Sequence, residues 1–273
     1  MNRIEKRFKE LAARGETAFI PYITAGDPTL EQTAQLVMEL EKAGADVIEF
    51  GVPFSDPVAD GIVNQEAAQR ALKHNVSLHD IVSLVKRLRS TTQIPLVLFT
   101  YFNPVLAYGL EALAADAADA GVDGILCVDL PPEEATEYKR LLDAKGIATV
   151  FLIAPTSTPD RVKLIAESCT GFVYYVSRTG VTGERADIAT SVKSMVDQIK
   201  ACTCTPVAVG FGISTPDQAA EVSGYADGVI VGSAIVRMVG ELGDTGEMPS
   251  KVGAFVKSLA DACKTRGGNV RVS

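Results

Sequence analysis

Histidine is nearly absent from the sequence, which contains only His74 and His79. Both fall in the region of helical pattern that follows a long acidic loop. We therefore expect neither a histidine-based catalytic triad nor a metal site with several histidine ligands. Lysine is missing from every predicted strand end, which argues against an aldolase that forms a Schiff base with its substrate. Acid and base chemistry by carboxylates remains.

Paired cysteines and long hydrophobic runs are also missing. The five cysteines make an odd count without C-x-x-C spacing, so we expect thiols in a reducing cytosol and no zinc or redox site (Cys127, Cys169, Cys202, Cys204, Cys263). No run is long enough to span a membrane, and the start, MNRIEKRFKEL, lacks the apolar stretch of a signal peptide. Ile4, Phe8 and Leu11 instead stand at helical spacing, which predicts a short helix covering one end of the domain. We expect a cytoplasmic protein.

The chain has little positive charge. Its formal net charge is −8, and its lysines and arginines are scattered, so nucleic acid is not an expected partner. Hydrophobic residues make up 47% and charged residues 22%, as in a folded domain with a sizeable core. The length of 273 residues is close to the roughly 250 of one α/β barrel. No change in composition marks a seam, so we expect one domain over 1–273.

Short runs rich in β-branched and apolar residues alternate with amphipathic stretches of helical period, such as EQTAQLVMELEKAG and PPEEATEYKRLLDAKG. Strand followed by helix, repeated about eight times, predicts a (β/α)₈ barrel, the fold often called a TIM barrel. An open doubly wound sheet is the alternative, although no GxGxxG fingerprint follows the first strand. The expected strands are Phe19–Thr24, Asp46–Phe50, Pro95–Thr100, Gly124–Val128, Thr149–Ile153, Phe172–Val176, Pro206–Gly210 and Gly228–Val231.

Helix boundary signals agree with this pattern. The segment STPD occurs at Ser157 and again at Ser214, and it supplies a capping hydroxyl, a proline for the first turn and an acid. Gly44, Gly121 and Gly146 each close an apolar helix just before the next strand, where a glycine at C′ is expected. In such a barrel the active site lies in the loops after the strands.

The loop after the second strand, DVIEFGVPFSDPVADG, carries the first candidate. By strand alternation Val47 and Glu49 share one face, and Ile48 and Phe50 share the other. If the apolar pair packs on helices, Glu49 points into the barrel mouth. Burial would raise the pKa of that carboxyl toward the range in which it can both donate and accept a proton near neutral pH. The alternative is a structural glutamate that is salt-bridged in the core.

Two aspartates, Asp56 and Asp60, lie on the same loop. An aspartate in a loop is often only a turn former, but together with Glu49 the pair resembles an acid/base site of two carboxylates. Prolines stiffen this loop and a glycine lets it turn (Pro53, Pro57, Gly61).

Three glycine-rich segments come late in the chain, at 177–183, 210–214 and 231–235. The last two follow the seventh and eighth strands, where barrels commonly bind phosphate, and VGSAI opens a helix whose N-terminal amides favour an anion. Backbone N–H donors would let an acidic protein bind phosphate without a basic cluster. Simple turn chemistry is the other interpretation of these glycines.

Taken together, these residues resemble the tryptophan synthase α subunit family. The similarity runs over nearly the whole chain, through FIPYITAGDP, IEFGVPFSDPVADG, FTYFNP, VDLPPEE, YYVSRTGVTG, GFGIST and VGSAIV, and the second segment is the most specific. The resemblance implies a lyase of tryptophan biosynthesis that cleaves indole-3-glycerol phosphate to indole and glyceraldehyde 3-phosphate. This retro-aldol reaction needs no metal or cofactor in the α subunit.

The resemblance also implies roles for single residues. Glu49 matches the general acid/base, and Asp60 matches the acid that holds the indole N–H and stabilises the cationic ring. Thr182 would close over the substrate toward Asp60. Residues matching the phosphate site are Gly183, Phe211, Gly212, Gly232 and Ser233. Residues matching positions near the substrate or its indole ring are Tyr22, Thr100, Ile153 and Tyr174.

A partner is implied as well: a pyridoxal-phosphate-dependent β subunit that receives indole through a tunnel in an α₂β₂ heterotetramer. Pro53 and Asp56 match contact positions, and pyridoxal phosphate would belong to the partner alone. One position departs from the family, since Ile62 stands where a proline is usual. Two alternatives stay open: another phosphate-binding barrel enzyme, such as an isomerase or synthase, and a non-catalytic subunit that only activates a β partner.

Overall fold

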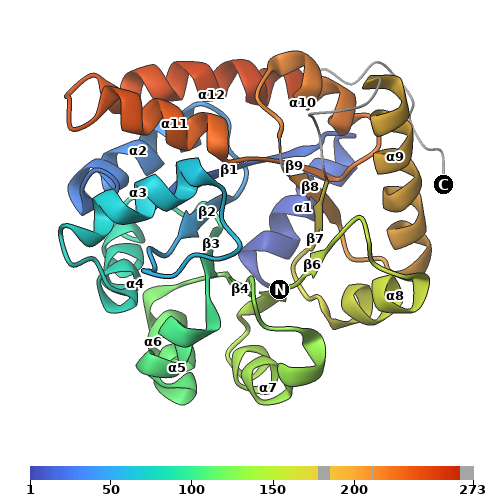
Figure 1. Ribbon diagram of the computed structural model, residues 1–273, viewed down its shortest axis with the longest axis horizontal. Coiled ribbons are helices and arrows are strands. Elements are labelled where there is room, and N and C mark those ends of the chain that lie inside the picture. Colours follow the sequence, from blue (N-terminus) through green and yellow to red (C-terminus); the bar gives the residue numbers. More distant parts are fainter. Residues whose placement is uncertain (178–184, 211, 265–273) are drawn as a thin grey trace.

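The computed structural model describes residues 1–177, 185–210 and 212–264, with only the backbone course for 185–189. Its strands form one parallel sheet, around which the helices lie as an outer ring (Figure 1). The strands are β1 Ala18–Thr24, β2 Ile48–Gly51, β3 Leu96–Thr100, β4 Gly124–Cys127, β5 Ala148–Val150, β6 Leu152–Ile153, β7 Val173–Val176, β8 Val207–Gly210 and β9 Gly228–Val231.

The sheet order shows how the barrel closes. It runs β5-β4-β3-β2-β1-β9-β8-β7-β6, and only Phe151 separates β5 from β6 along the chain. The two ends of the sheet therefore meet within one predicted strand, Thr149–Ile153, which the structure divides in two. The predicted (β/α)₈ barrel is confirmed, and the open doubly wound sheet is excluded.

Helices follow the strands as the periodicity predicts. A short 3₁₀ turn, Pro132–Glu134, precedes α7. The helices are α1 Arg3–Ala13, α2 Leu30–Lys42, α3 Ile62–Leu72, α4 Leu78–Leu88, α5 Phe102–Tyr108, α6 Leu110–Ala120, α7 Thr136–Ala144, α8 Pro159–Ser168, α9 Arg185–Cys202, α10 Pro216–Ser223, α11 Ser233–Leu242 and α12 Met248–Lys264.

The predicted helix boundaries are confirmed. Thr158 and Thr215 cap α8 and α10, and each hydroxyl accepts a hydrogen bond from the backbone N–H three residues on. A proline follows each cap in the first turn, where its missing N–H costs nothing. Gly44, Gly121 and Gly146 have φ values of 100°, 83° and 70°, which glycine adopts without strain.

Alternation along each strand divides the core into two clusters. Val47 packs inside the barrel, whereas Ile48 and Phe50 pack outward in the layer between strands and helices. The inner cluster also takes in Phe8 of α1, whose ring centroid lies 6.0 Å from that of Phe172. Helix α1 thus covers one end of the barrel, as its apolar spacing predicts.

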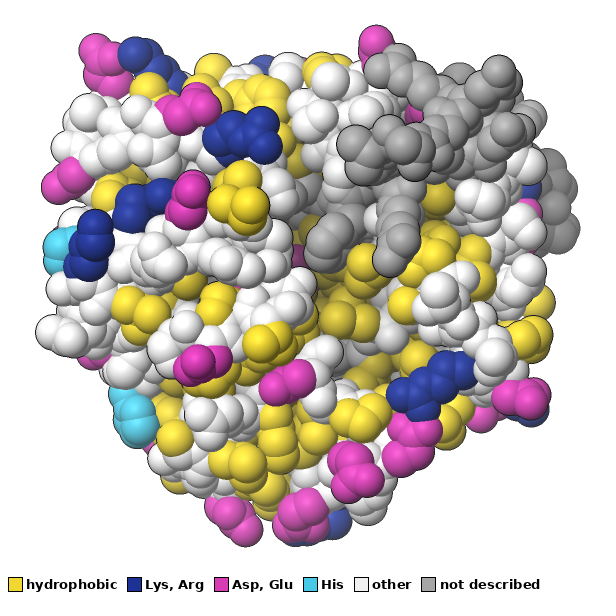
Figure 2. All heavy atoms as spheres, viewed as in Figure 1, with side chains coloured by type: hydrophobic (Ala, Val, Ile, Leu, Met, Phe, Trp, Pro, Cys, Tyr) yellow, Lys and Arg dark blue, Asp and Glu magenta, His cyan; other side chains and the backbone are white. Residues whose placement is uncertain are grey.

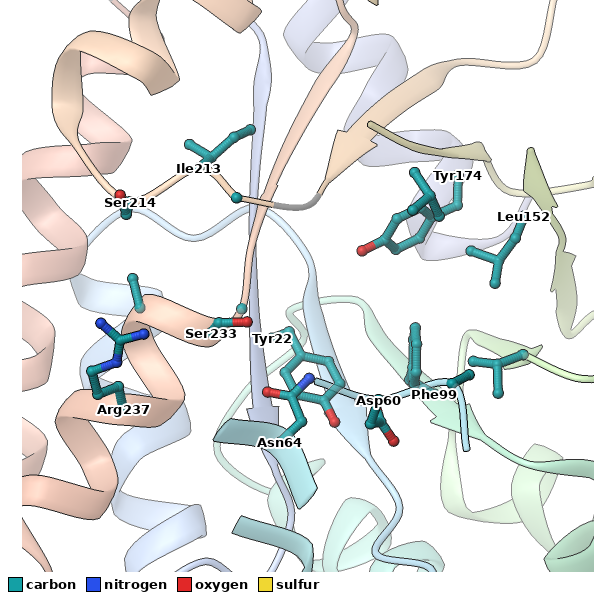
Figure 3. Close-up of a pocket in the computed structure, with 16 residues that line it drawn as sticks. Tyr22, Asp60, Asn64, Phe99, Leu152, Tyr174, Ile213, Ser214, Ser233 and Arg237 are labelled. Atoms are coloured by element: carbon teal, nitrogen blue, oxygen red, sulfur yellow. The ribbon is translucent and has the colours of Figure 1, made fainter. Parts of the chain in front are cut away.

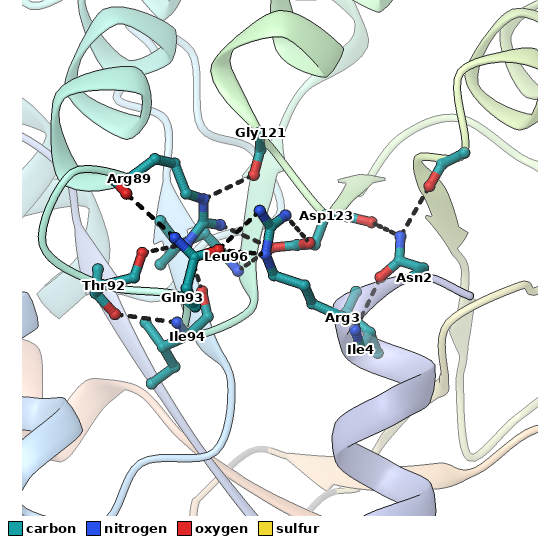
Figure 4. Close-up of polar contacts among 11 residues, drawn as sticks. Asn2, Arg3, Ile4, Arg89, Thr92, Gln93, Ile94, Leu96, Gly121 and Asp123 are labelled. Atoms are coloured by element: carbon teal, nitrogen blue, oxygen red, sulfur yellow. Dashed lines mark hydrogen bonds and ion pairs between the residues drawn. The ribbon is translucent and has the colours of Figure 1, made fainter.

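Three aspartates, of which Asp46 and Asp123 are buried, stabilise the end of the barrel at which the strands begin. Asp123, just before β4, accepts hydrogen bonds from Arg3, from Arg89 and from the backbone N–H of Leu96 (Figure 4). Asp46 and Asp227, before β2 and β9, likewise pair with a basic side chain and accept a backbone N–H from the neighbouring strand. These ion pairs stabilise the end of the barrel at which the strands begin. The active site of such a barrel lies at the opposite end, where the strands finish.

No helix within the described ranges is long and apolar enough to cross a membrane. The same residues also contain no group of three or more histidine, cysteine, aspartate or glutamate side chains that could hold a metal ion.

Candidate active site

A cavity of about 400 Å³ lies at the end of the barrel where the strands finish. The face of the molecule shown in Figure 2 is hollowed near its centre, and hydrophobic side chains line the wall there. Figure 3 shows the lining residues converging from strands, loops and helix α11. They are Tyr22, Ala59, Asp60, Asn64, Phe99, Val128, Leu152, Tyr174, Val176, Gly212, Ile213, Ser214, Gly232, Ser233, Ala234 and Arg237.

Glu49 is fully buried inside the barrel, next to this cavity. It follows Val47 on the inward face of the chain and pairs in register with Tyr22 on β1, which lines the cavity. Neither carboxylate oxygen has a hydrogen-bond partner among the described residues, which excludes the salt-bridged alternative there. Burial raises the pKa of Glu49 to about 8, because a charge would be poorly solvated.

Two tyrosines flank Glu49 and reach the cavity wall. Tyr22 lies over Gly51 of the neighbouring strand, and Tyr174 lies over Gly210; a Cβ on either glycine would overlap the phenol. Burial raises the pKa of both tyrosines far above the usual range, and the field of Glu49 contributes in the same direction. Both phenols therefore stay protonated and act as neutral hydrogen-bonding groups.

Asp60 lies at the cavity wall and is held there by Tyr101. The Tyr101 hydroxyl donates to Asp60 Oδ2 over 2.9 Å and accepts the backbone N–H of Ala59 over 3.0 Å. Gln65 donates from its side chain to the Asp60 carbonyl, which ties the loop to helix α3. Partial burial raises the pKa of the Asp60 carboxyl, and hydrogen bonds from Tyr101 and Asn64 oppose that rise. The net effect is a raised pKa, which these hydrogen bonds limit, and the bond from Tyr101 holds the carboxyl at the cavity wall.

The opposite side of the cavity is suited to an anion. Gly232 is the N-cap of α11 and Ser233 its first residue, and no side chain caps this helix end within the described part of the chain. Its first amides are thus left to face the cavity, together with the Ser233 side chain and Gly212. Arg237, one turn further along α11, is the only basic side chain among the lining residues that the structure describes.

Two residues that the family resemblance places at the indole pocket lie elsewhere. Thr100 and Ile153 are buried but do not line the cavity, and Ile153 packs in the outer layer against the helices. Their neighbours Phe99 and Leu152 line it instead. The reason is strand alternation, which turns successive side chains to opposite faces.

The structure describes only some of the other expected site residues. Thr182, Gly183 and Phe211 lie outside the described residues. Asp56 is exposed on its loop, whereas Pro53 is buried.

The residues of the site that were not expected from the sequence include Tyr101, Arg237 and Asn64. Tyr101 had a signal, because it directly follows a strand. Arg237 lay on the predicted helix opened by VGSAI, one turn beyond the predicted phosphate motif. Asn64, in the first turn after the acidic loop, had no signal that distinguished it from a solvent-facing residue.

A parallel barrel with a buried glutamate of raised pKa, a positioned aspartate and an open helix N-terminus defines an acid/base enzyme acting on a phosphorylated substrate. Comparison with known proteins specifies the class further. The family model "Tryptophan synthase alpha chain" matches residues 8–264. A relative of that name from Geotalea uraniireducens is 50% identical over 98% of this chain and 100% of its own length. One from Geobacter sulfurreducens is 50% identical over 96% and 99%.

Solved structures agree. Tryptophan synthase subunit alpha from Legionella pneumophila superposes with a TM-score of 0.88 at 39% identity, covering 96% of this chain and 98% of that one. A chain of tryptophan synthase from M. tuberculosis in an aminoacrylate-bound form gives 0.86 at 34%, covering 97% and 100%. The chain belongs to the tryptophan synthase alpha chain family.

Proposed function

We propose that this chain is a carbon–carbon lyase that cleaves indole-3-glycerol phosphate to indole and glyceraldehyde 3-phosphate, the α reaction of tryptophan biosynthesis. The observation that carries the proposal is Glu49, a carboxyl with no exposed surface and no hydrogen-bond partner in the described chain, placed beside the cavity. An unpartnered buried acid is costly to the fold, and a role in proton transfer explains its presence.

The cavity suits the two ends of this substrate. Its aromatic and aliphatic walls, formed by Tyr22, Phe99 and Leu152, can hold the indole ring beside Asp60. The phosphate would bind at the start of α11, on the amides that follow Gly232 and on the Ser233 hydroxyl.

Glu49 would act twice in the reaction. Its protonated carboxyl donates to the indole carbon that bears the side chain, and the ring becomes cationic. The resulting carboxylate then accepts the proton of the adjacent hydroxyl as the carbon–carbon bond breaks and its electron pair returns to the ring. The hydroxyl carbon leaves as an aldehyde, and Glu49 is protonated again. The chain's own chemistry therefore needs no cofactor.

Asp60 would stabilise the cationic ring. A fixed carboxylate beside the indole N–H is strongest while positive charge develops on that nitrogen, and it needs no reorganisation at that moment. The hydrogen bond from Tyr101 positions this group. Glu49 is buried beside the cavity and is not among its lining residues, so its side chain would have to turn toward the cavity to reach the substrate.

The family name also supports a partner, the β subunit of tryptophan synthase, in an α₂β₂ assembly that carries the pyridoxal phosphate. Large apolar side chains are exposed on the elements near the cavity opening: Val58 at 87%, Ile62 at 73% and Leu106 at 54%. Together with exposed Asp56 they offer a surface that a partner would cover. Pro53, being buried, would contribute through the shape of the loop.

Product analysis tests the proposed reaction. Purified chain incubated with indole-3-glycerol phosphate should release indole and glyceraldehyde 3-phosphate in equal amounts, and more rapidly when a tryptophan synthase β subunit is added. Absence of both products, with and without the β subunit, would contradict the proposal.

The raised pKa of Glu49 predicts the alkaline limb of the pH profile. Since the protonated form starts the reaction, kcat/KM should be nearly constant below pH 8 and fall about tenfold per unit well above it. A profile measured between about pH 6.5 and 10 checks this. If kcat/KM instead rises through pH 8, the ionised carboxyl is the active form and the assignment of the first step is wrong.

Arg237 should contribute to capture of the phosphate. Arg237→Gln removes the only basic side chain of the described cavity wall, and because the arginine is exposed we expect KM to rise only about twofold to fivefold, with kcat nearly unchanged. Arg237→Lys is the control and should retain most of the effect, and added salt should narrow the gap between variants. An unchanged KM in the glutamine variant would show that the phosphate is held without Arg237.

A further inference from the structure

One side chain that lines the cavity, that of Asn64, carries a buried polar atom without a partner. The structure has six buried side-chain oxygens without a hydrogen bond in its described part, and of the residues that carry them only Asn64 lines the cavity. Its Oδ1 is an acceptor, and an acceptor buried without a donor destabilises the fold. The position thus calls for a donor that is not a residue of the described chain.

The orientation of the Asn64 amide follows from its neighbour. The side chain lies close enough to Asp60 for a hydrogen bond between them to lower the pKa of that carboxyl. A carboxylate only accepts hydrogen bonds, so the amide nitrogen must face Asp60. Oδ1 is then turned away from the carboxylate.

Asn64 lies between the two ends of the site. In Figure 3 its side chain is drawn between Ser233, at the start of α11, and Asp60, with Tyr22 beside it. Under the proposed function the phosphate is held near Ser233 and the indole N–H at Asp60. What passes Asn64 is the three-carbon chain that joins them, and its hydroxyl groups are its only hydrogen-bond donors.

We propose that Asn64 is a specificity-determining residue that recognises the hydroxylated chain of the substrate, its Oδ1 accepting a hydrogen bond from a chain hydroxyl while its Nδ2 faces Asp60. This inference rests on the proposed function. It means that the site distinguishes a polyol phosphate from an alkyl phosphate attached to the same ring. An apolar residue here would lose that distinction.

The test compares two ligands on one variant. Indole-3-glycerol phosphate and 3-(indol-3-yl)propyl phosphate share the ring and the phosphate, but the second lacks the chain hydroxyls. Affinities are measured by calorimetry on the Glu49→Gln background, which prevents turnover during the titration. Asn64→Leu should weaken binding of the hydroxylated ligand about 3- to 10-fold, as expected for one lost hydrogen bond, and that of the propyl ligand less than twofold. An indirect effect of the substitution through Asp60 should change the affinity for both ligands by the same factor, since both carry the indole N–H.

Gln65→Leu is the matched control. It removes the neighbouring amide, which holds the loop backbone at Asp60 and does not line the cavity, so it should affect both ligands by the same factor. Thermal unfolding of Asn64→Leu should show one cooperative transition like that of the parent, which establishes that the variant is folded. Equal weakening of both ligands by Asn64→Leu, or no weakening, would overturn the inference. If neither ligand binds the parent protein, the proposed function itself fails.

Discussion

Glu49→Gln is expected to lower the rate of indole release by about 10²- to 10⁴-fold, or roughly 3–5 kcal/mol in barrier height. Glutamine has nearly the same shape but can neither donate an acidic proton to the ring nor accept the hydroxyl proton. Steady-state or single-turnover assays of indole release, without a β subunit, measure the loss. A variant within a few-fold of the wild type would remove Glu49 from the mechanism.

The same substitution should stabilise the fold at alkaline pH. Between the ordinary carboxyl pKa of 4.5 and about 8, Glu49 is protonated in the folded chain and ionised in the unfolded chain. The unfolded state then binds fewer protons, so the free energy of unfolding falls by about 1.4 kcal/mol per pH unit as pH rises through this window. Glutamine does not titrate, so the free energy of unfolding of the variant lacks this pH-dependent fall.

An inactive Glu49→Gln variant could have lost proton transfer, or it could have a damaged fold. Denaturant unfolding at pH 5 and pH 8 distinguishes these two explanations. Glu49→Gln should gain stability over the wild type as pH rises from 5 to 8, while its activity stays low at both. Lower stability at pH 8 would instead point to a damaged fold and to a structural role for the carboxyl.

Asp60→Asn is expected to slow the reaction by about 10²- to 10³-fold, the usual cost of losing one fixed electrostatic partner of a developing charge. The amide remains within reach of Tyr101 but carries no negative charge for the ring nitrogen. Because the proposed phosphate site lies at the far end of the cavity, affinity for glyceraldehyde 3-phosphate should change by less than twofold. The loss should therefore appear in kcat.

Asp56→Asn provides the matched control. It makes the same chemical change on the same loop, at an exposed residue whose side chain bonds only to Ser55 in the described structure. Assayed without the β subunit, it should leave the cleavage rate within about twofold of the wild type, as an exposed change away from the site does. Equal losses in both variants would assign the effect to loop conformation and not to the Asp60 charge.

The fold was predictable because its signals are local. Strand alternation placed Ile48 and Phe50 against the helices and Glu49 inside the barrel, and cap residues such as Thr158 and Gly121 marked helix boundaries correctly. The division of one predicted strand at Phe151 was not predictable, because it depends on where the closing barrel loses its pairing.

The site was predictable only in part, because it joins loops that are distant in sequence. The hydrogen bond from Tyr101 to Asp60 joins two different βα loops, and no local sequence pattern predicts it. The assignment of Thr100 and Ile153 to the pocket failed by one residue each, since a shift of one position reverses the face of a strand. The unpartnered state of Asn64 is a three-dimensional property that no sequence pattern displays.

The most direct test of the account is the titration of Glu49 itself. Carbon-13 NMR of glutamate-labelled protein, with the side-chain carboxyl signal of Glu49 identified by its absence in Glu49→Gln, follows the protonation of this one group. The account predicts a midpoint at about 8, caused by burial without a hydrogen-bond partner. A midpoint near the ordinary 4.5 would contradict it, because Glu49 would then be ionised at neutral pH and could not deliver the first proton.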